Sequence, residues 1–401
     1  MRRLCVWWDG RIVGRLTQDD HGDLSFVYDA AWLIDGHALS RSLPLRAEPF
    51  DRRACRPFFG GLLPEADQRD SVAQALGVSA ANEFALLDRL GGDVAGALSL
   101  LPEDAAPLAP ARFDTPPQPL SDNDFAAILD RLPLRPMLAG EAGLRLSLAG
   151  AQAKLPVILV EGRPALPRPG EATTHIVKPE IPRFAGSVEN EAWCMVLARA
   201  VGLDVAQAQA RDAVGRPYLL VERYDRAIGE GVTVRLHQED ACQALGIAAE
   251  RKYAAEGGPA FRDLFALTRA YVRQPAVDVL KLVDAATFNL CIGNADAHGK
   301  NFSFLLDDAG PRLAPLYDLL STLAWPDLSP RLAMRIGRAG TITELDGEAW
   351  GRFSEDAGVG LAFLKRRVRT LAETIGAMAG DDHLLARQTA MRAGLVVQSV
   401  R

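Results

Sequence analysis

Residues 293–301 carry the pattern with the clearest chemical meaning: the run Gly-Asn-Ala-Asp-Ala-His-Gly-Lys-Asn places Asp296 five positions before Asn301. A short hydrophobic stretch, which we interpret as a hairpin, follows and leads to Tyr317-Asp318. Phosphoryl transfer needs a carboxylate that accepts the proton of the attacking hydroxyl, and oxygen ligands that hold magnesium against the phosphates. The spacing therefore predicts a phosphotransferase catalytic loop. The alternative is an ordinary polar turn between a helix and a strand.

A loop of small residues is a candidate phosphate-binding segment. Residues 147–154 read Ser-Leu-Ala-Gly-Ala-Gln-Ala-Lys and lie between two strand-like runs. Small side chains let backbone N–H groups approach an anion closely. The loop is neither a G-x-G-x-x-G nor a Walker sequence, so a surface turn is the alternative.

Lys178 ends an apolar strand-like run and is followed by Pro179, which stops the strand. Its ammonium is a candidate partner for the α- and β-phosphates. Glu189 and Glu191 lie in the first turn of an expected helix, where the helix dipole favours carboxylates whatever their function. Either is a candidate to orient Lys178, and we prefer Glu191.

A continuous apolar run, Tyr-Leu-Leu-Val at 218–221, predicts a hinge strand whose backbone pairs with an adenine edge. The polar residues that follow it, Glu222, Arg223 and Tyr224, are expected beside the nucleotide. A buried strand that ends in a charged turn is the alternative.

The composition is that of a globular enzyme. The chain has 401 residues, 48% hydrophobic and 24% charged, which is enough for a sizeable core and two or three domains. A net charge of −6 gives no field that holds nucleic acid unaided. The N-terminus lacks a signal peptide and no run reaches membrane-spanning length, so we expect a cytoplasmic protein. Five scattered cysteines without a C-x-x-C pair predict buried thiols rather than a zinc site or disulfides.

The elements that must position these residues follow from periodicity. Alternation over 4–16 around Asp9-Gly10 predicts a hairpin, and 24–28 reads as a further strand. Residues 58–65 read as a turn and 66–90 as helix stopped by Gly91-Gly92, while the Pro- and Ala-rich stretch 102–119 reads as a linker. Strands are expected at 146–160 and 174–178, then a helix capped by Ser187 and running to 200. The pattern is mostly helical from 237 onward, with a strongly apolar helix at 277–290.

These motifs together resemble the HipA family of serine/threonine kinase toxins from bacterial type II toxin-antitoxin systems. The resemblance rests on S-L-A-G-A-Q-A-K (147–154), H-I-V-K-P (175–179), V-E-N-E (188–191), V-E-R-Y-D-R (221–226), G-N-A-D-A-H-G-K-N (293–301) and L-Y-D-L-L-S (316–321). In the N-terminal part it rests on F-F-G-G-L-L-P-E (58–65) and L-G-G-D-V-A-G-A (90–97).

The resemblance implies an α+β, protein-kinase-like, two-lobed fold. An N-terminal subdomain would span residues 1–105, a sheet-rich lobe with the ATP loop and hinge 125–230, and an all-helical lobe with the catalytic and metal-binding motifs 231–401.

The resemblance also implies roles for individual residues. Asp296 would be the catalytic base, and His298 would support the catalytic loop. Asn301 and Asp318 would bind Mg²⁺, and Ser147 would be autophosphorylated, which would push its loop out of the ATP site. The ATP-binding residues implied are Ala149, Gly150, Ala151, Gln152, Ala153, Lys154, Lys178, Glu222, Arg223, Tyr224, Asp296, His298, Lys300 and Asp318.

The partners implied by the resemblance are a HipB-type helix-turn-helix antitoxin and a protein substrate of the aminoacyl-tRNA synthetase class, whose phosphorylation halts translation and slows growth. DNA would be contacted only indirectly, through the antitoxin, and a membrane not at all. Two alternatives remain open from the residues: a small-molecule kinase on the same scaffold, and a nucleotide-binding co-repressor without transfer activity.

Overall fold

The computed structural model describes residues 2–105, 115–141, 143–229, 232–307 and 309–401. It forms two compact units. The first comprises Met1–Ile181, Gln209–Glu239 and Gln243–Glu250, and the second comprises Pro182–Ala208, Asp240–Cys242 and Arg251–Arg401. The chain passes between the units within β12 (His237–Asp240) and again within α7 (Ala241–Leu245).

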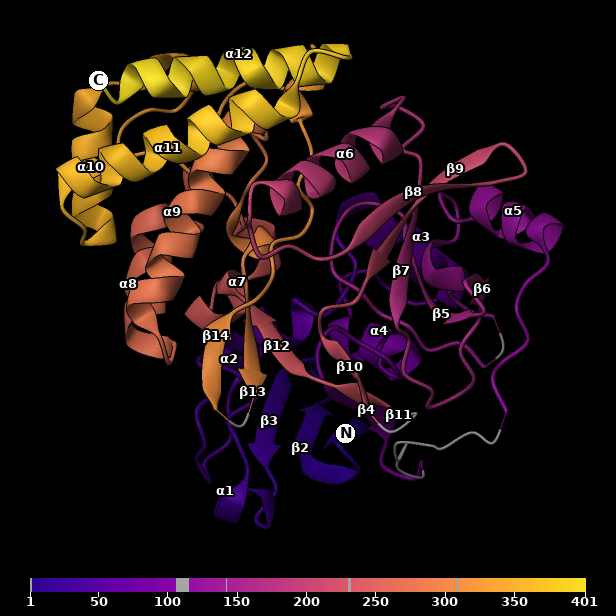
Figure 1. The fold of residues 1–401 in the computed structure, drawn as a ribbon. Coiled ribbons are helices and arrows are strands. Elements are labelled where there is room, and N and C mark those ends of the chain that lie inside the picture. Colours follow the sequence, from indigo (N-terminus) through magenta and orange to yellow (C-terminus); the bar gives the residue numbers. More distant parts are fainter. Residues whose placement is uncertain (1, 106–114, 142, 230–231, 308) are drawn as a thin grey trace. The chain divides into compact units, whose positions relative to one another are not determined.

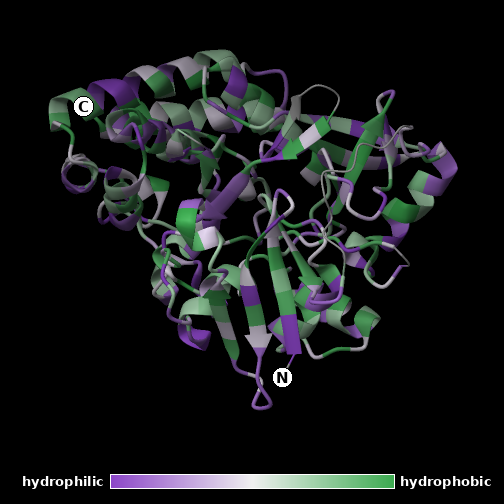
Figure 2. Ribbon diagram, turned by 90° about the horizontal axis from the view of Figure 1, so that it is seen from below, coloured by the Kyte–Doolittle hydropathy of each residue, from purple (hydrophilic) through white to green (hydrophobic). Residues whose placement is uncertain are grey.

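The first unit opens with an antiparallel sheet of order β3-β2-β1-β4. Its strands are β1 (Arg2–Trp8), β2 (Arg11–Gln18), β3 (Leu24–Tyr28) and β4 (Leu98–Pro102). Asp9 and Gly10 both have positive φ, 47° and 76°, as the tight turn of a β-hairpin requires. The predicted hairpin and third strand are confirmed. Bands of hydrophobic and hydrophilic residues alternate along these strands because one face covers the core (Figure 2).

Helices follow the sheet where the sequence predicted a turn. α2 (Arg52–Gly60) begins at the N-cap Asp51 and buries Phe58 and Phe59, so the turn expected over 58–65 is wrong for its first half. The single helix expected over 66–90 is also wrong: α3 (Ala66–Leu76) stops at Gly77, which has φ 67°, and α4 (Glu83–Leu90) restarts at the N-cap Asn82. The short α1 spans Trp32–Asp35.

A second sheet of the first unit has the order β6-β5-β7-β9-β8. Its strands are β5 (Leu155–Val160), β6 (Arg163–Ala165), β7 (His175–Pro179), β8 (Ala208–Ala213) and β9 (Arg216–Glu222). α5 (Asp122–Arg131) packs on β9, with the Phe125 and Tyr218 rings 5.0 Å apart. Residues 146–154, expected as the start of a strand, form a loop. A hairpin of β10 (Arg226–Gly229) and β11 (Val232–Arg235) follows, and residues 106–114 of the expected linker lie outside the described residues.

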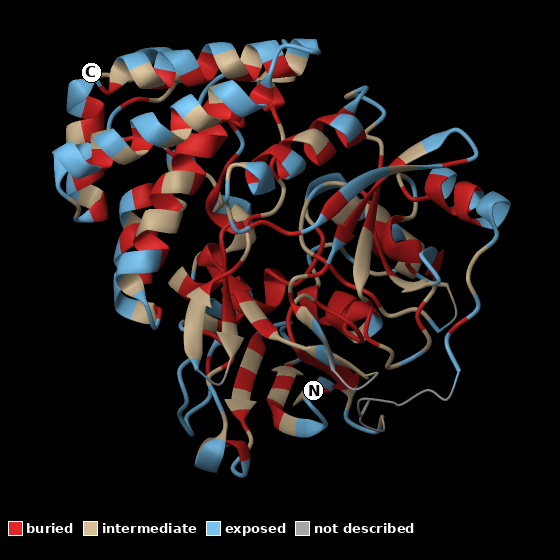
Figure 3. Cartoon of the chain, viewed as in Figure 1, coloured by how far each residue is buried: buried red, intermediate tan, exposed pale blue. Residues whose placement is uncertain are grey.

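The second unit is mainly helical (Figure 1). Its helices are α6 (Ser187–Ala200), α8 (Phe261–Tyr271), α9 (Pro275–Ile292), α10 (Gly347–Ala357), α11 (Leu361–Ala379) and α12 (Leu384–Ser399). Ser187 is the first residue of α6 and Gly186 occupies the N-cap position, so the expected role of Ser187 as the cap is wrong. α9 is the central helix and is mostly buried, whereas α11 and α12 expose one side (Figure 3). The hairpin of β13 (Ser303–Asp307) and β14 (Gly310–Leu313) stands where the sequence predicted it.

All five cysteines are buried, as expected. Burial raises the pKa of Cys55 to about 12, and it raises the pKa of Cys194 and Cys291 further. Within the described ranges, the helices are too short or too polar to cross a lipid bilayer.

Candidate active site

The catalytic loop starts where α9 ends. Gly293 takes a left-handed conformation with φ 76°, which terminates the helix and releases residues 294–301. Asp296 is exposed, whereas the other residues of 291–300 are buried. Its backbone N–H donates to Oδ1 of Asn294 at 3.1 Å, and Nδ2 of Asn294 donates to Oδ1 of Asn289 on α9 at 2.9 Å. The loop backbone is thus held by buried amides while the Asp296 carboxylate faces outward.

Asn301 and Asp318 lie side by side. The Asn301 carboxamide accepts the His298 backbone N–H at Oδ1 (3.0 Å) and donates from Nδ2 to Oδ2 of Asp318 (3.1 Å). Asp318 has φ 58°, a conformation that costs an L-residue roughly 1 kcal/mol or more and is typical of functional sites. Carboxylate and amide oxygens are the hard ligands that Mg²⁺ prefers, and these two side chains supply one of each, although here the Asn301 nitrogen faces the carboxylate; their metal-binding role stays a prediction.

His298 and Lys300 are buried on the same loop. The His298 ring packs edge-on against Tyr253, with centroids 5.2 Å apart. The Lys300 ammonium lies 2.6 Å from Oδ2 of Asp240, and the Tyr317 hydroxyl donates to the Lys300 carbonyl at 2.5 Å. Neither Asp240 nor Tyr317 was predicted as a site residue from the sequence.

In the first unit, residues 147–154 form a loop that is fastened at its start. Ser147 is fully buried, and its hydroxyl donates to the Leu62 carbonyl at 2.7 Å. Its backbone N–H donates to the Asp93 carbonyl at 3.0 Å. The Gly150 carbonyl accepts the Glu65 N–H at 3.1 Å. The two motifs of the N-terminal region, around 58–65 and 90–97, therefore hold this loop.

Two further contacts shape the loop. Lys154 folds back so that its ammonium donates to the Ala149 carbonyl at 2.6 Å. Gly150 has φ 112°, a backbone conformation that favours glycine, and a Cβ there would lie 2.5 Å from Nζ of Lys154, so the lysine side chain would have to shift. Nε2 of Gln152 donates to the Pro179 carbonyl at 3.4 Å, which joins the loop to the end of β7. Ala151 is exposed and Ala153 is buried.

Lys178 lies on β7 opposite Leu219 of β9, and the lysine is only 8% exposed. In the second unit, Glu191 is 3% exposed on α6, whereas Glu189 is on the exposed side of that helix. A buried carboxylate needs a partner, and whether Glu189 or Glu191 orients Lys178 stays a prediction.

The three expected hinge residues have different surroundings. Glu222 is exposed at the end of β9, and the Tyr224 hydroxyl bonds the Gln238 side-chain oxygen. The Arg223 guanidinium is buried in an ionic cluster, and its expected place beside the nucleotide stays a prediction. Its Nη2 and Nε contact both oxygens of Asp225 at 2.8 and 2.9 Å, and its backbone N–H is bonded to the Thr174 carbonyl.

Asp93 completes this cluster, which we call the Arg/Asp cluster: Asp93, Arg223, Asp225, Arg226 and Arg235. The Asp93 carboxylate contacts Arg226 at 2.9 Å, Arg235 at 3.0 Å and Arg223 at 3.4 Å. Burial raises the pKa of Asp93 and Asp225, but the guanidinium groups outweigh it and lower the pKa of both, that of Asp225 to about 2. The cluster is therefore ionised and structural.

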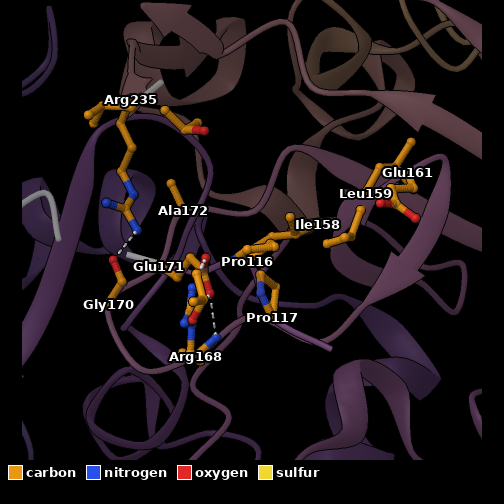
Figure 4. Close-up of a pocket in the computed structure, with 14 residues that line it drawn as sticks. Pro116, Pro117, Ile158, Leu159, Glu161, Arg168, Gly170, Glu171, Ala172 and Arg235 are labelled. Carbon is orange, nitrogen blue, oxygen red and sulfur yellow. Dashed lines mark hydrogen bonds and ion pairs between the residues drawn. The ribbon is translucent and has the colours of Figure 1, made fainter. Parts of the chain in front are cut away.

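A separate cavity of about 450 Å³ lies in the first unit between β5, β11 and residues 168–172 (Figure 4). Arg168 and Glu171 pair with each other at its wall, at 2.8 Å, and Arg235 reaches the Gly170 carbonyl. The residues described as lining it include none of the site residues predicted from the sequence.

The residues missed by sequence reasoning share one property: their partners are far away in the chain. Asp240 pairs with a lysine 60 positions later, and Asp93 with arginines more than 100 positions later. The local feature that could have indicated them is a charged residue inside a run that otherwise reads as a strand, as in the His-Gln-Glu-Asp sequence of β12.

The fold is that of a protein-kinase-like protein of mixed helix and sheet. Residues 4–101 match the HipA N-terminal domain and residues 146–381 the HipA-like C-terminal domain. The chain therefore belongs to the HipA family.

Individual relatives agree with this assignment. A Sinorhizobium fredii protein named "Putative kinase Y4mE" is 62% identical over 93% of this chain and 90% of its own length. The serine/threonine-protein kinase toxin HipA of Shewanella oneidensis is 34% identical over 81% of this chain and 76% of its own length. A chain from the solved complex of Shewanella oneidensis HipA, HipB and operator DNA superposes with a TM-score of 0.84 at 29% identity, covering 99% of this chain and 96% of that one.

Proposed function

We propose that this protein is an ATP- and Mg²⁺-dependent protein serine/threonine kinase that acts as the toxin of a type II toxin-antitoxin system. Membership of the HipA family supports the class of enzyme. The observation that carries the proposal is the exposed Asp296 on a loop whose Asn301 contacts Asp318. This is the residue set that phosphoryl transfer needs: a base for the hydroxyl and oxygen ligands for the metal.

In this proposal Asp296 accepts the proton of the substrate hydroxyl as the hydroxyl oxygen attacks the γ-phosphorus of ATP, the bond from the γ-phosphorus to the bridging oxygen breaks, and ADP leaves. Asn301 and Asp318 hold Mg²⁺, which neutralises charge on the phosphates when bound. Lys178 orients the α- and β-phosphates, and Glu191 rather than Glu189 orients Lys178. Residues 149–154 offer backbone N–H groups to the phosphates, and the backbone near Glu222 and Tyr224 contacts the adenine. The side chain of Arg223 stabilises this segment through the Arg/Asp cluster instead of contacting ATP.

Autophosphorylation of Ser147 is part of the proposal. The hydroxyl is buried against the Leu62 carbonyl, so it can reach a γ-phosphate only when the loop leaves this position. A phosphoserine carries close to two negative charges and cannot return to a buried site next to a carbonyl oxygen. Phosphorylation would thus hold the loop outward and switch the kinase off.

The proposed substrate is an aminoacyl-tRNA synthetase, whose modification would inhibit translation and growth. The proposed neutralising partner is a HipB-type antitoxin, since the superposed relative was solved with HipB and operator DNA. The acidic balance of this chain agrees with a basic DNA-binding partner.

The test is transfer from γ-labelled ATP in cell extract, with Asp296→Asn as the inactive control because it removes the proton acceptor and keeps the shape. Label in a synthetase band and on Ser147, both absent with Asp296→Asn, supports the proposal. Label confined to metabolites indicates a small-molecule kinase. Absence of any transfer with the unaltered chain indicates a nucleotide-binding co-repressor. Growth arrest on expression, relieved by a co-expressed HipB-type protein, tests the toxin role.

A further inference from the structure

The Lys300 ammonium is buried and forms an ion pair. It lies 2.6 Å from Oδ2 of Asp240, and the side chains are only 5% and 9% exposed. A buried ion pair at this distance is strongly coupled, and removing one partner leaves a charge that the site must accommodate. The net charge of the pair is zero, although the lysine stands next to the proposed metal ligand Asn301.

The neighbours of Asp240 bind the same loop. The N–H of Ala241 donates to the Phe302 carbonyl at 2.9 Å. A Cβ on Gly299 would lie 3.0 Å from Sγ of Cys242, so this short segment packs closely on the start of the Gly299–Asn301 turn. Residues 240–242 therefore contact the loop at three successive points: a backbone bond, a packing contact and an ion pair.

The Lys300 backbone is fixed as firmly as its ammonium. Its carbonyl accepts the Tyr317 hydroxyl at 2.5 Å, and Tyr317 also bonds Oγ of Ser303 at 2.7 Å. Tyr317 directly precedes Asp318, and Lys300 directly precedes Asn301. The contacts of Lys300 thus set where both proposed metal ligands lie.

We propose that Asp240 is a positioning residue of the metal site: its carboxylate neutralises Lys300 and holds it away from the cation that Asn301 and Asp318 bind. This inference rests on the proposed function. It gives Lys300 a role different from direct support of the phosphates, because the ammonium is committed to a carboxylate of its own unit.

The physical reason is electrostatic. Replacing Asp240 by Asn changes the charge of the pair from zero to +1 at the residue that directly precedes the proposed metal ligand Asn301. In a partly buried environment, charge repulsion over several ångströms weakens cation binding by about tenfold or more. Removing both charges in Asp240→Asn/Lys300→Met returns the net charge to zero. The double variant should therefore bind the metal better than the Asp240→Asn single variant does.

The experiment uses the full chain, Mn²⁺ as an electron-paramagnetic probe of the metal site, and a non-hydrolysable ATP analogue. Compared with the unaltered chain, we expect Mn²⁺ affinity to fall about tenfold or more in Asp240→Asn, to stay within about threefold in the double variant, and to rise in Lys300→Met, where the Asp240 carboxylate keeps its negative charge. Affinity for the analogue without metal should stay unchanged in all three. Arg216→Met, which breaks an exposed pair with Asp130, serves as the control and should alter neither.

Equal Mn²⁺ affinity of Asp240→Asn and the unaltered chain would overturn the inference, as would a double variant as weak as the single one. Loss of metal-free analogue binding in Lys300→Met would show that Lys300 contacts phosphate and would also overturn it. If Asp240→Asn does not fold, Lys300→Met and the double variant decide, and an Mn²⁺ affinity that is the same in Lys300→Met as in the unaltered chain would overturn the inference. An unaltered chain that binds no Mn²⁺ with the analogue overturns the proposed function as well. A chain that binds the metal but transfers no phosphate overturns the function and leaves the role of Asp240 intact.

Discussion

Asp318 is the residue at which the proposed chemistry can be tested most directly, because its backbone has a positive φ of 58° and its carboxylate accepts a hydrogen bond from Asn301, the other proposed metal ligand. Asp318→Asn should lower Ser147 phosphorylation about 100-fold or more and increase the Mg²⁺ concentration needed for half-maximal rate. Rates measured by intact-protein mass spectrometry across a Mg²⁺ titration would show this. Asp307→Asn, in the preceding hairpin and paired with Arg312, is the matched control and should behave like the unaltered chain. Equal rates in both variants would contradict the assignment of Asp318 as a metal ligand.

Arg223 gives a second prediction at this scale, on stability instead of catalysis. Arg223→Met removes a cation that is 1% exposed and leaves Asp225 buried without its principal partner. We expect the unfolding free energy to fall by about 3–5 kcal/mol. Arg216→Met, whose pair with Asp130 is exposed, should cost less than about 1 kcal/mol. Urea denaturation followed by tryptophan fluorescence compares the two, and similar losses would mean that the cluster adds nothing beyond a surface pair.

Among the elements, the loop at 147–154 depends on a single glycine. Gly150→Ala forces a Cβ to within 2.5 Å of the Lys154 ammonium and strains a φ of 112°, so the lysine must release the Ala149 carbonyl. We expect the KM for ATP to rise about tenfold, from about 1 kcal/mol of strain and a lost hydrogen bond. Gly162 also has a positive φ, 78°, but nothing lies within 4 Å of a Cβ built there. Gly162→Ala therefore serves as a control that adds backbone strain without a steric clash. A comparable change in KM with Gly162→Ala would show that the contact with Lys154 is irrelevant.

Elements set by local chemistry could be predicted from the sequence, and those set by distant partners could not. The Asp9-Gly10 hairpin was predictable because the turn residues themselves select its geometry. α2 was missed because Pro57 and Gly60-Gly61 look like a turn, while the burial of Phe58 and Phe59 that stabilises the helix depends on the sheet beneath it. In the site, Asp296, Asn301 and Asp318 were recognisable by spacing. Asp240 was not, since nothing near it in the sequence indicates a lysine 60 residues away.

At the scale of the whole molecule, stability should depend on pH through buried histidines. Burial lowers the pKa of His237 to about 4, with Nε2 on the Leu39 carbonyl and the ring against Trp8. In the unfolded chain this histidine has a pKa near 6.5, so below pH 6.5 the unfolded state binds more protons than the folded state. The stability that neutral His237 contributes is therefore complete above pH 6.5 and is lost as the pH falls toward 4. The loss attributable to His237 is about 3 kcal/mol.

Thermal unfolding of the full chain between pH 7 and pH 4 would measure this effect. His237→Gln should be less stable at pH 7 but should show a shallower decline on acidification. His21→Gln, at an exposed position in the β2–β3 turn, provides the matched control and should leave the slope unchanged. A slope unaltered by His237→Gln would assign the acid sensitivity to other groups.

The burial of all five thiols gives the chain a practical property. Sulfhydryl reagents attack thiolates that solvent can reach, and here the pKa of Cys55 is raised to about 12 inside the core. Thiol-reactive dyes should therefore leave the unaltered chain unlabelled. A single cysteine introduced at the exposed Ala151 would accept a fluorophore without any prior removal of natural ones. Single-molecule fluorescence could then measure how often that loop takes its inward and its outward position.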